Sequence, residues 1–325
     1  MLESRLFHLD NPKMTDPLSD VLSLLDAESL VSTGLKAGGG WSLRVDGHEG
    51  LKFNAVLSGT AWLAIDGRPD PIALAAGDCF LLARGLPFTM AADLAIPPVN
   101  ATEVFSITQG AVATMGDGAD FHVVGGRMTL DKASSAILVD ALPDCIVLPA
   151  GSERASAMRW LLNRFAAEVE GTDAGHGASA AKLMHLMFIE LIRAHLAVPD
   201  QRQQGWLHAL ADPKIGKALR LMHEAPVRPW TLKELAESTA MSRSSFAQRF
   251  RERVGMPPLD YLLRWRMRLA RRDMLTRRES MTEVSRRYGY ASESAFGNAF
   301  KRVFGHPPRR SVMEAAPHEE RPRPG

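Results

Sequence analysis

Polar side chains suited to base edges recur in two similar stretches near the C-terminal end of this 325-residue chain. Ser242-Arg-Ser-Ser-Phe-Ala-Gln-Arg-Phe250 is echoed, fifty residues later, by Ser292-Glu-Ser-Ala-Phe-Gly-Asn-Ala-Phe300. Gln and Asn amides can pair bidentately with adenine, Ser hydroxyls can donate or accept, and Arg or Lys can reach phosphates. The predicted chemistry is therefore nucleic-acid recognition by two similar elements rather than catalysis.

Each stretch predicts a helix with one buried and one exposed face. The Phe residues fall at the four-residue spacing of a buried stripe, so they are interpreted as core. The remaining positions are predicted to face the partner: Arg243, Ser244, Ala247, Gln248 and Arg251 in the first helix, and Glu293, Ser294, Gly297, Asn298, Lys301 and Arg302 in the second. Of these, Ala247 and Gly297 offer little beyond van der Waals contact.

The flanking residues predict a helix, a turn and a second helix in each copy. In the first copy, Thr231 is placed to cap one helix, Thr239–Met241 forms a tight turn, and Ser242 caps the next helix. Gly255 can adopt the left-handed conformation that ends that helix. The second copy has a turn one residue longer, and its second helix ends at Gly305.

The formal net charge of +2 conceals a strong asymmetry along the chain. Asp212 to Ser311 holds 22 Lys and Arg against 10 Asp and Glu, whereas Met1 to Ala211 holds 15 against 24. Several of the basic residues lie in Arg264–Arg272, which predicts a helix joining the two copies. A run of charged residues usually marks no more than a solvent-exposed surface. An excess of this size over one domain favours a polyanionic partner, bound less tightly as salt rises.

From Gly205 to about Val312 the chain resembles the AraC/XylS family of bacterial transcription regulators. The resemblance rests on Gly205–Pro213, Trp230–Ala236, Met241–Ser244, Arg264–Ala270, and Gly289–Arg302 followed by Gly305–Pro308. It implies two helix-turn-helix units joined by a long helix, with recognition helices in successive major-groove turns about 34 Å apart. By position, it assigns base reading to Ser244, Ala247 and Gln248, and to Glu293, Ser294, Gly297 and Asn298.

A different kind of chain precedes the basic region. Between Gly39 and Ala150, short apolar runs alternate with Gly, Pro and Asp, and Asp66-Gly67 is a hairpin signal. The predicted strands are Leu51–Leu57, Thr60–Ile65, Cys79–Ala83, Phe121–Val124 and Ile146–Leu148. This pattern favours a barrel or double-sheet jelly roll.

The strand-rich segment also resembles the cupin-type N-terminal domain found on one branch of AraC regulators, through Leu57–Trp62, Leu74–Pro87 and Leu142–Pro149. The expected fold is therefore multidomain, α and β. A cupin-like β-barrel or jelly roll with flanking helices is followed by an all-α domain of two helix-turn-helix units joined by a long helix.

Enzymatic cupins hold a metal with two or three His and a Glu, and this sequence departs from that set. Asn54 and Phe88 stand where His residues often sit, and His48 beside Glu49 is interpreted as an exposed turn pair. We expect no metal and no cofactor. A barrel can still bind a small effector in its mouth, and the candidates for this are Trp41, Phe53, Trp62, Arg84 and Phe88. In the equally weighted alternative, the aromatic residues fill an ordinary core and Arg84 faces water.

Two apolar helices are predicted at Ser152–Val169 and Ala180–Leu196, and the second is apolar nearly all round. The resemblance implies a homodimer contact there. The predicted domains are 14–197, cupin-like and regulatory, and 206–312, DNA-binding, with a linker at 198–205. Residues 1–13 are expected to be disordered or a non-native start, with Met14 a more natural start than Met1, and residues 313–325 to be a disordered tail.

The sequence also supports expectations about the cellular compartment and the function of the protein. No apolar run approaches the roughly 18 residues of a membrane span, so a cytoplasmic protein without membrane contact is expected. Cys79 and Cys145 are then expected to be reduced, although a redox-sensing pair stays open. The favoured function is a transcription regulator, not an enzyme, that binds promoter DNA under control of a small molecule, with RNA polymerase a plausible partner. The alternative is a cupin-type enzyme fused to a DNA-targeting domain; the sequence lacks the His cluster and the common nucleophile and phosphate-loop motifs.

Overall fold

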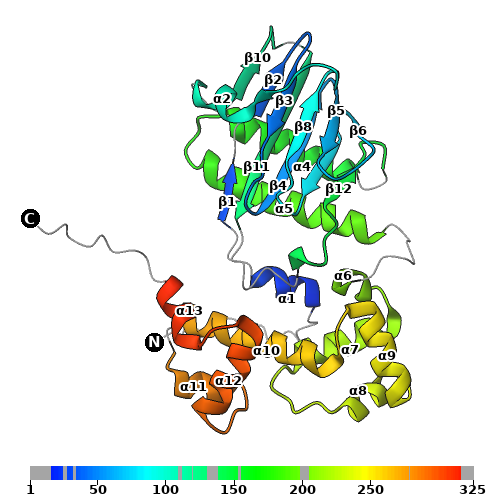
Figure 1. Cartoon of the computed structure of the whole chain (residues 1–325), viewed down its shortest axis with the longest axis vertical. Coiled ribbons are helices and arrows are strands. Elements are labelled where there is room, and N and C mark those ends of the chain that lie inside the picture. The colour runs from blue at the N-terminus through cyan, green and yellow to red at the C-terminus, as the bar shows by residue number, and fades with distance from the viewer. Residues whose placement is uncertain are drawn as a thin grey trace, which may run out of the picture. The chain divides into compact units, whose positions relative to one another are not determined.

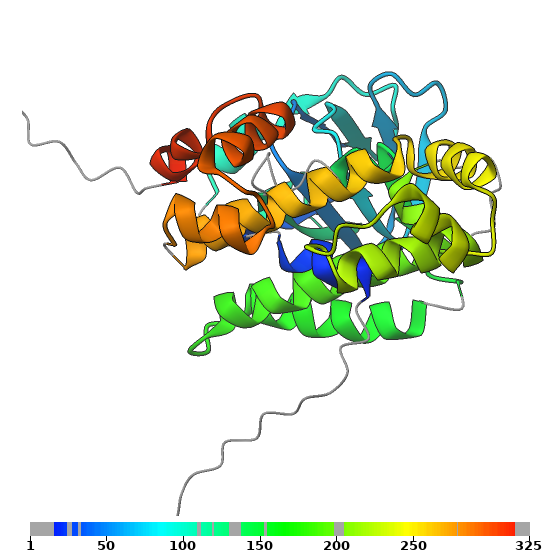
Figure 2. The same ribbon diagram turned by 90° about the horizontal axis from the view of Figure 1, so that it is seen from below.

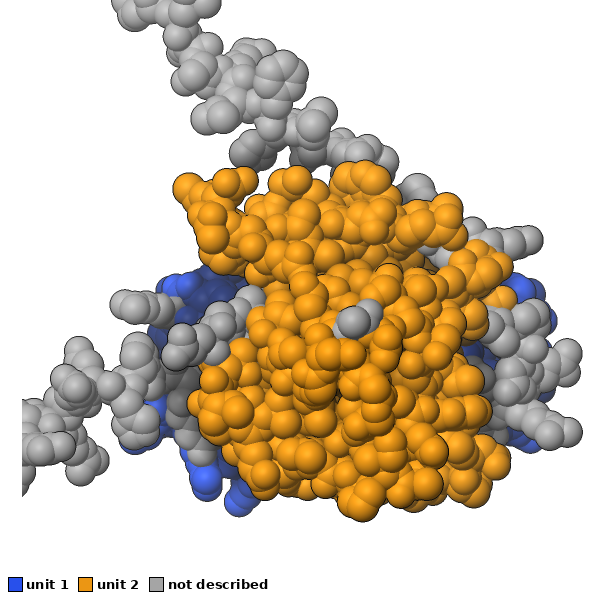
Figure 3. Space-filling model, turned by 90° about the horizontal axis from the view of Figure 1, so that it is seen from above, with its two compact units in different colours: residues 1–25, 133–138, 202–325 blue, residues 26–132, 139–201 orange. Residues whose placement is uncertain are grey.

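The computed structural model describes residues 16–24, 28–31, 34–108, 112–118, 120–129, 138–152, 155–197, 205–277 and 279–315. Contacts divide the chain into two units, coloured in Figure 3: residues 26–132 with 139–201, and residues 1–25 with 133–138 and 202–325. The expected segments 1–13 and 198–204 lie outside the described residues. Among the described residues, no helix is both long and apolar enough to cross a bilayer.

The unit of residues 26–132 and 139–201 is a jelly roll of two sheets (Figure 1). One sheet has the order β10-β2-β11-β4-β7-β12, with β1 added beside β11: β10 (Val112–Met115), β2 (Gly34–Ala37), β11 (Phe121–Thr129), β4 (Leu51–Ser58), β7 (Cys79–Leu82), β12 (Cys145–Leu148) and β1 (Glu28–Val31). The other has the order β6-β5-β8-β3-β9: β6 (Ile72–Ala75), β5 (Thr60–Ile65), β8 (Phe88–Ala91), β3 (Ser42–Val45) and β9 (Val99–Asn100). A short helix, α2 (Ala101–Ser106), follows β9.

Alternation along the strands builds the core between these sheets. The core cluster consists of apolar side chains that point inward and are buried, and Trp41 stacks on Phe121 with ring centroids 4.9 Å apart. Helices α4 (Ala155–Glu170) and α5 (His176–Ala197) cover the opposite face of the larger sheet (Figure 1). Phe53 of β4 meets Phe165 of α4 there, edge to face at 6.4 Å. The predicted strands and both predicted helices are confirmed, and the architecture is a jelly roll rather than a closed barrel.

The two cysteines lie on neighbouring strands but do not approach one another. In the antiparallel β7–β12 ladder Cys145 pairs with Leu82, and Cys79 pairs with Leu148. The thiols are thus three residues apart along the strands, about 10 Å, and point to opposite faces. They cannot form a disulfide in this fold. Burial also raises the pKa of Cys145 to about 11 and that of Cys79 further, so neither thiol is a reactive thiolate at neutral pH.

The unit of residues 1–25, 133–138 and 202–325 is entirely helical in its described residues. It contains α1 (Pro17–Ser23), α6 (Trp206–Ala209), α7 (Pro213–Glu224), α8 (Leu232–Ser238), α9 (Arg243–Val254), α10 (Pro258–Thr276), α11 (Met281–Arg287), α12 (Glu293–Phe304) and α13 (Pro308–Ala315). Figure 2 shows α10 running between the α8–α9 and α11–α12 pairs. Helix α13 extends three residues into the segment expected to be a tail.

Helix α1 belongs to the helical unit by its contacts, whereas the sequence placed residues 14–24 with the jelly roll. Its Asp20 lies 3.1 Å from Nδ1 of His223 in α7. The other ring nitrogen of His223 is 2.7 Å from the Tyr261 hydroxyl, which accepts a hydrogen bond from Trp206 Nε1. A neutral His223 with its proton on Nδ1 satisfies every group in this buried chain. Burial lowers the pKa of His223, although Asp20 opposes the shift.

Candidate nucleic-acid interface

Local hydrogen bonds fix the first helix-turn-helix unit. Thr231 and Glu234 form a capping box: the Thr231 hydroxyl accepts from the Glu234 N–H, and the Glu234 carboxylate accepts from the Thr231 N–H. Ala240, with φ of 51°, makes the sharp turn after α8. Ser242 caps α9 by accepting from the Ser245 N–H, and Gly255 ends α9 in the left-handed conformation. The predicted caps, turn and stop of this unit are confirmed.

The second unit repeats this construction. Ser280 and Glu283 form the capping box of α11, and Ser292 caps α12 by accepting from the Ala295 N–H. Gly289, with φ of 80°, takes the place of Ala240 in the turn, and Gly305 ends α12. The capping boxes are 49 residues apart and the recognition-helix caps 50 apart, because the second turn is one residue longer.

The phenylalanine stripes are core, as predicted. Phe246 and Phe250 are fully buried with ring centroids 5.7 Å apart, and Phe296 and Phe300 are fully buried at 5.9 Å. Phe304 is only half-buried and packs on Phe300 at 4.5 Å. Helices α9 and α12 are therefore each anchored by one face, and the opposite face is left exposed.

A buried carboxylate stabilises each helix-turn-helix unit by accepting hydrogen bonds from neighbouring helices. Asp212 caps α7 and accepts two hydrogen bonds from Arg249 of α9, at 3.0 and 2.8 Å. Burial opposes ionisation of this carboxyl. The N–H groups of Ile215 and Lys214, together with Arg249, nevertheless hold the pKa of Asp212 below its ordinary value. In the second unit, Asp273 of α10 accepts from the Tyr288 hydroxyl at 2.8 Å and from Arg287 at 3.2 Å.

The candidate reading residues occupy the faces expected of them. The exposed ones are Arg243, Ser244, Gln248 and Arg251 on α9, and Glu293, Ser294, Asn298, Lys301 and Arg302 on α12. Ala247 and Gly297 are half-buried at the centre of each face. The structure therefore brings the candidates of each helix together on one surface, and their contact with DNA remains a prediction.

Three of these residues have partners that the sequence did not reveal. Gln248 donates its amide to the Glu252 carboxylate at 2.9 Å, one helical turn further along α9. Glu293 accepts a hydrogen bond from the Thr282 hydroxyl of α11. Arg302 pairs with Asp260 at 2.9 Å. The Asp260 carboxylate partly neutralises the charge that Arg302 could otherwise offer to a phosphate. The i, i+4 spacing of Gln248 and Glu252 was a signal that could have been found in the sequence.

The basic run of the linking helix is not a simple phosphate-binding surface. Arg268 and Arg271 of α10 are 5% and 9% exposed. Arg266 donates to the backbone oxygens of Pro226 and Arg228, and Arg272 pairs with Asp273. Much of the excess positive charge in this run therefore holds the helical unit together. Sequence counting cannot separate such arginines from solvated ones, because both carry the same charge.

Comparison with known proteins agrees with this geometry. Residues 16–197 match the family model described as "Cupin", and residues 235–311 match that described as "Helix-turn-helix domain". The chain is 39% identical over 293 residues to a Streptomyces lividans protein described as an AraC-like transcription regulator, covering 90% of this chain and 96% of that one. The chain belongs to the family of AraC-like transcription regulators.

Further relatives share the same description or a similar one. A Streptomyces antibioticus AraC-like regulator is also 39% identical, over 90% of this chain and 97% of the relative. The regulator AlkR of Acinetobacter baylyi is 29% identical, over 85% and 92% of the two chains. Among solved structures, ToxT from Vibrio cholerae aligns over 90% of this chain and 98% of its own, at 13% identity and a TM-score of 0.35. Full-length relatives that are regulators favour this function over the enzyme alternative.

The structure does not bring the five effector candidates of this AraC-like regulator to one site. Trp41, Phe53 and Phe88 are buried, but Phe53 faces the helices while Phe88 lies between the sheets. Trp62 is 42% exposed. Arg84 pairs with Asp144 at 2.7 Å and donates to the Leu142 oxygen at 3.2 Å, so its charge is already balanced. Alternation along the strands separates these residues.

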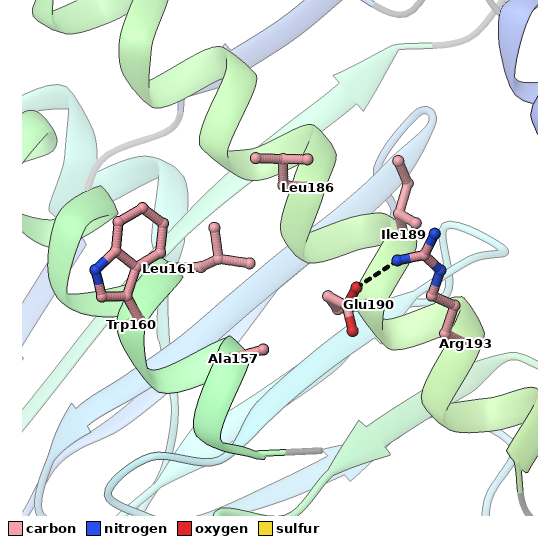
Figure 4. A pocket seen from close by; sticks show the side chains of 7 residues that line it. All are labelled: Ala157, Trp160, Leu161, Leu186, Ile189, Glu190 and Arg193. Carbon is pink, nitrogen blue, oxygen red and sulfur yellow. Dashed lines mark hydrogen bonds and ion pairs between the residues drawn. The ribbon is translucent and has the colours of Figure 1, made fainter.

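The described residues contain no group of three or more His, Cys, Asp or Glu side chains that could hold a metal ion. The sequence-based expectation of a metal-free protein stays a prediction. A shallow groove lies instead between α4 and α5 (Figure 4), lined by Ala157, Trp160, Leu161, Leu186 and Ile189, with the ion pair Glu190–Arg193 at 2.7 Å. Trp160 is 65% exposed and Leu186 is 49% exposed. Helix α5 therefore leaves one apolar face open, although its sequence predicted burial all round.

Proposed function

We propose that this AraC-like regulator binds promoter DNA sequence-specifically, with α9 and α12 in successive major-groove turns, and that a small molecule bound by the jelly roll modulates this binding. The observation that carries the DNA proposal is the repeated, fully capped helix-turn-helix. In both copies a buried Phe pair fixes a polar exposed face. Short polar side chains on such faces suit base edges, and flanking Arg and Lys suit phosphates.

Footprinting of the full-length protein on promoter fragments tests this proposal. Two protected major-groove segments about one helical turn apart are expected on one side of the duplex. A single protected segment, or binding that is equal on every sequence, would contradict the proposal that α9 and α12 each read one segment.

Coupling between effector and DNA affinities must be reciprocal, so an effector that tightens DNA binding must itself bind more tightly when DNA is present.

A homodimer contact at the α4–α5 groove is also proposed. An exposed Trp beside exposed and half-buried aliphatic side chains is unusual for a free surface. A second copy supplies the same apolar groove, which suits a two-fold contact. In sedimentation experiments, Trp160→Glu should convert dimers to monomers, whereas the matched control Trp62→Glu, on the other sheet, should not. A wild-type monomer at micromolar concentration would contradict the proposal.

RNA polymerase is proposed as a further partner on the ground of family membership alone.

A further inference from the structure

Two basic side chains, Lys52 and His48, meet one aromatic ring inside the jelly roll, and a third, the exposed Arg127, is the cross-strand neighbour of Lys52. The Lys52 ammonium lies 5.8 Å from the centroid of the Phe88 ring, and the His48 ring meets Phe88 edge-on at 6.4 Å. Arg127 of β11 pairs directly with Lys52 in the β4–β11 ladder, so both side chains leave the same face of the sheet. Lys52 comes from β4, Arg127 from β11 and His48 from the loop before β4.

The part of the chain that the structure describes supplies no counter-ion for Lys52 and Arg127. Among the residues that the structure describes, neither Lys52 nor Arg127 forms an ion pair. Both ring nitrogens of His48 are buried beside the backbone of Glu49 and Gly50, and no side chain among the described residues pairs with them. Burial and the nearby Arg127 lower the pKa of Lys52, and burial with Lys52 lowers the pKa of His48. Among the described residues, no carboxylate therefore offsets the cost of burying the Lys52 charge beside the exposed Arg127.

A buried amide extends the same donor surface. Asn54 lies two residues beyond Lys52 on the same face of β4 and is 5% exposed, and its Nδ2 has no hydrogen-bond partner in the described residues. Opposite it on β11 stands Gly125, where a Cβ would lie 2.4 Å from Asn54 Oδ1. The absence of a side chain at position 125 thus makes room for the amide. Unpartnered buried donors are rare enough in folded proteins to point to a missing acceptor.

Other cations of the jelly roll show that the fold readily supplies carboxylates. Arg44 binds Asp66 through two nitrogens, and Arg84 binds Asp144 at 2.7 Å. The cluster of His48, Lys52, Asn54 and Arg127 differs from both in containing no carboxylate. Its surroundings are apolar, since Leu82 pairs with Lys52 on β7 and Phe88 is fully buried. Donors on an apolar wall suit an anion that carries an apolar body.

We propose that His48, Lys52, Asn54 and Arg127 form an effector site for a small organic carboxylate, whose headgroup binds Lys52 and Arg127. This inference rests on the proposed control of the regulator by a small molecule, and it specifies the chemical class of that molecule. It also replaces the five candidates chosen from sequence. A bound carboxylate supplies the missing acceptor for the buried donors, and binding only to the folded state raises the melting temperature Tm.

The test uses the full-length protein with benzoate and hexanoate as probes and benzamide and hexanol as neutral counterparts, each at millimolar concentration. Either carboxylate is expected to raise the Tm by about 2 °C or more, and the neutral counterparts are not. Lys52→Met should abolish the carboxylate response while raising the Tm of the free protein, since it removes an uncompensated buried charge. A lysine with a purely structural role would give the opposite change in the free protein. Lys36→Met, on β2 of the same sheet, is the matched control and should keep the response.

Arg127→Gln covers the case in which Lys52→Met does not fold, because Arg127 is exposed and its loss should weaken carboxylate binding at least tenfold. Three results would overturn the inference: no shift with either carboxylate, equal shifts with the neutral compounds, or an undiminished response in Lys52→Met or Arg127→Gln. An equal shift with inorganic phosphate would show a general anion site and reject the organic class. Promoter binding measured in parallel separates the proposals, since its persistence without a carboxylate response refutes only this site.

Discussion

Gln248→Ala tests the position of the reading face most sharply. Gln248 is exposed on α9, and its amide is bound to Glu252. A bidentate contact between Gln and adenine is worth about 1–3 kcal/mol of discrimination. Since 1.4 kcal/mol corresponds to tenfold in affinity, the variant should bind its operator about 5- to 150-fold more weakly. Its binding to scrambled DNA should change little, because the side chain is uncharged.

The stability cost of this substitution is small by comparison. An exposed amide–carboxylate pair on a helix contributes about 0.2–0.5 kcal/mol, and Ala has the higher helix propensity. The Tm of Gln248→Ala should therefore match that of the wild type, and a loss of affinity cannot be attributed to unfolding. Glu252→Gln is the matched companion: it keeps an acceptor for the Gln248 amide but removes a negative charge, so it should tighten binding to scrambled DNA.

Fluorescence anisotropy with labelled operator and scrambled duplexes, at several salt concentrations, measures these effects. Arg251→Ala provides the contrast, since loss of one phosphate contact should weaken both duplexes and reduce the slope of log K against log salt by about 0.9. Equal losses on operator and scrambled DNA for Gln248→Ala would refute the assignment of this face of α9 to base reading.

Three further predictions concern the helical unit. Asn298→Ala should also lose about 1–3 kcal/mol on operator only, and loss at operator positions shared with Gln248→Ala would contradict two separate half-elements. Asp212→Ala should lower the free energy of unfolding by about 2–4 kcal/mol through a lost cap and Arg249 contact, against about 0–1 kcal/mol for the exposed control Asp260→Ala. This difference should shrink below about pH 4, where the unfolded carboxyl takes up its proton. His223 has a lowered pKa and is neutral when folded, so unfolding binds a proton and stability should fall as pH drops below about 6.5. His223→Gln should flatten that slope in chemical denaturation at pH 5–8, and an unchanged slope would count against a neutral buried ring.

Local signals explain why the helix-turn-helix units could be predicted from the sequence. A cap such as Ser242, a stop such as Gly255 and a Phe pair at four-residue spacing all act within one or two helical turns. Each is specified by its neighbours in the chain. The structure therefore places both copies at the predicted positions, including the longer second turn at Gly289.

Features that depend on tertiary packing were not predictable in the same way. Arg268 and Arg271 look in the sequence like part of a basic surface, but packing of α10 buries them. Phe53 and Phe88 were both predicted from the sequence to line an effector pocket. Alternation along the strands instead points Phe53 at the helices and Phe88 into the space between the sheets. Lys52 and Arg127, 75 residues apart, become a pair only through the β4–β11 register.

The most direct test of the DNA-binding account is selection of fragments of the source genome by the purified full-length protein at near-physiological salt, followed by sequencing. The account predicts enrichment of a few promoters that share two half-elements one helical turn apart, about 10 base pairs. Uniform recovery that disappears as salt rises would contradict it, because that behaviour requires only non-specific attraction between basic side chains and phosphates.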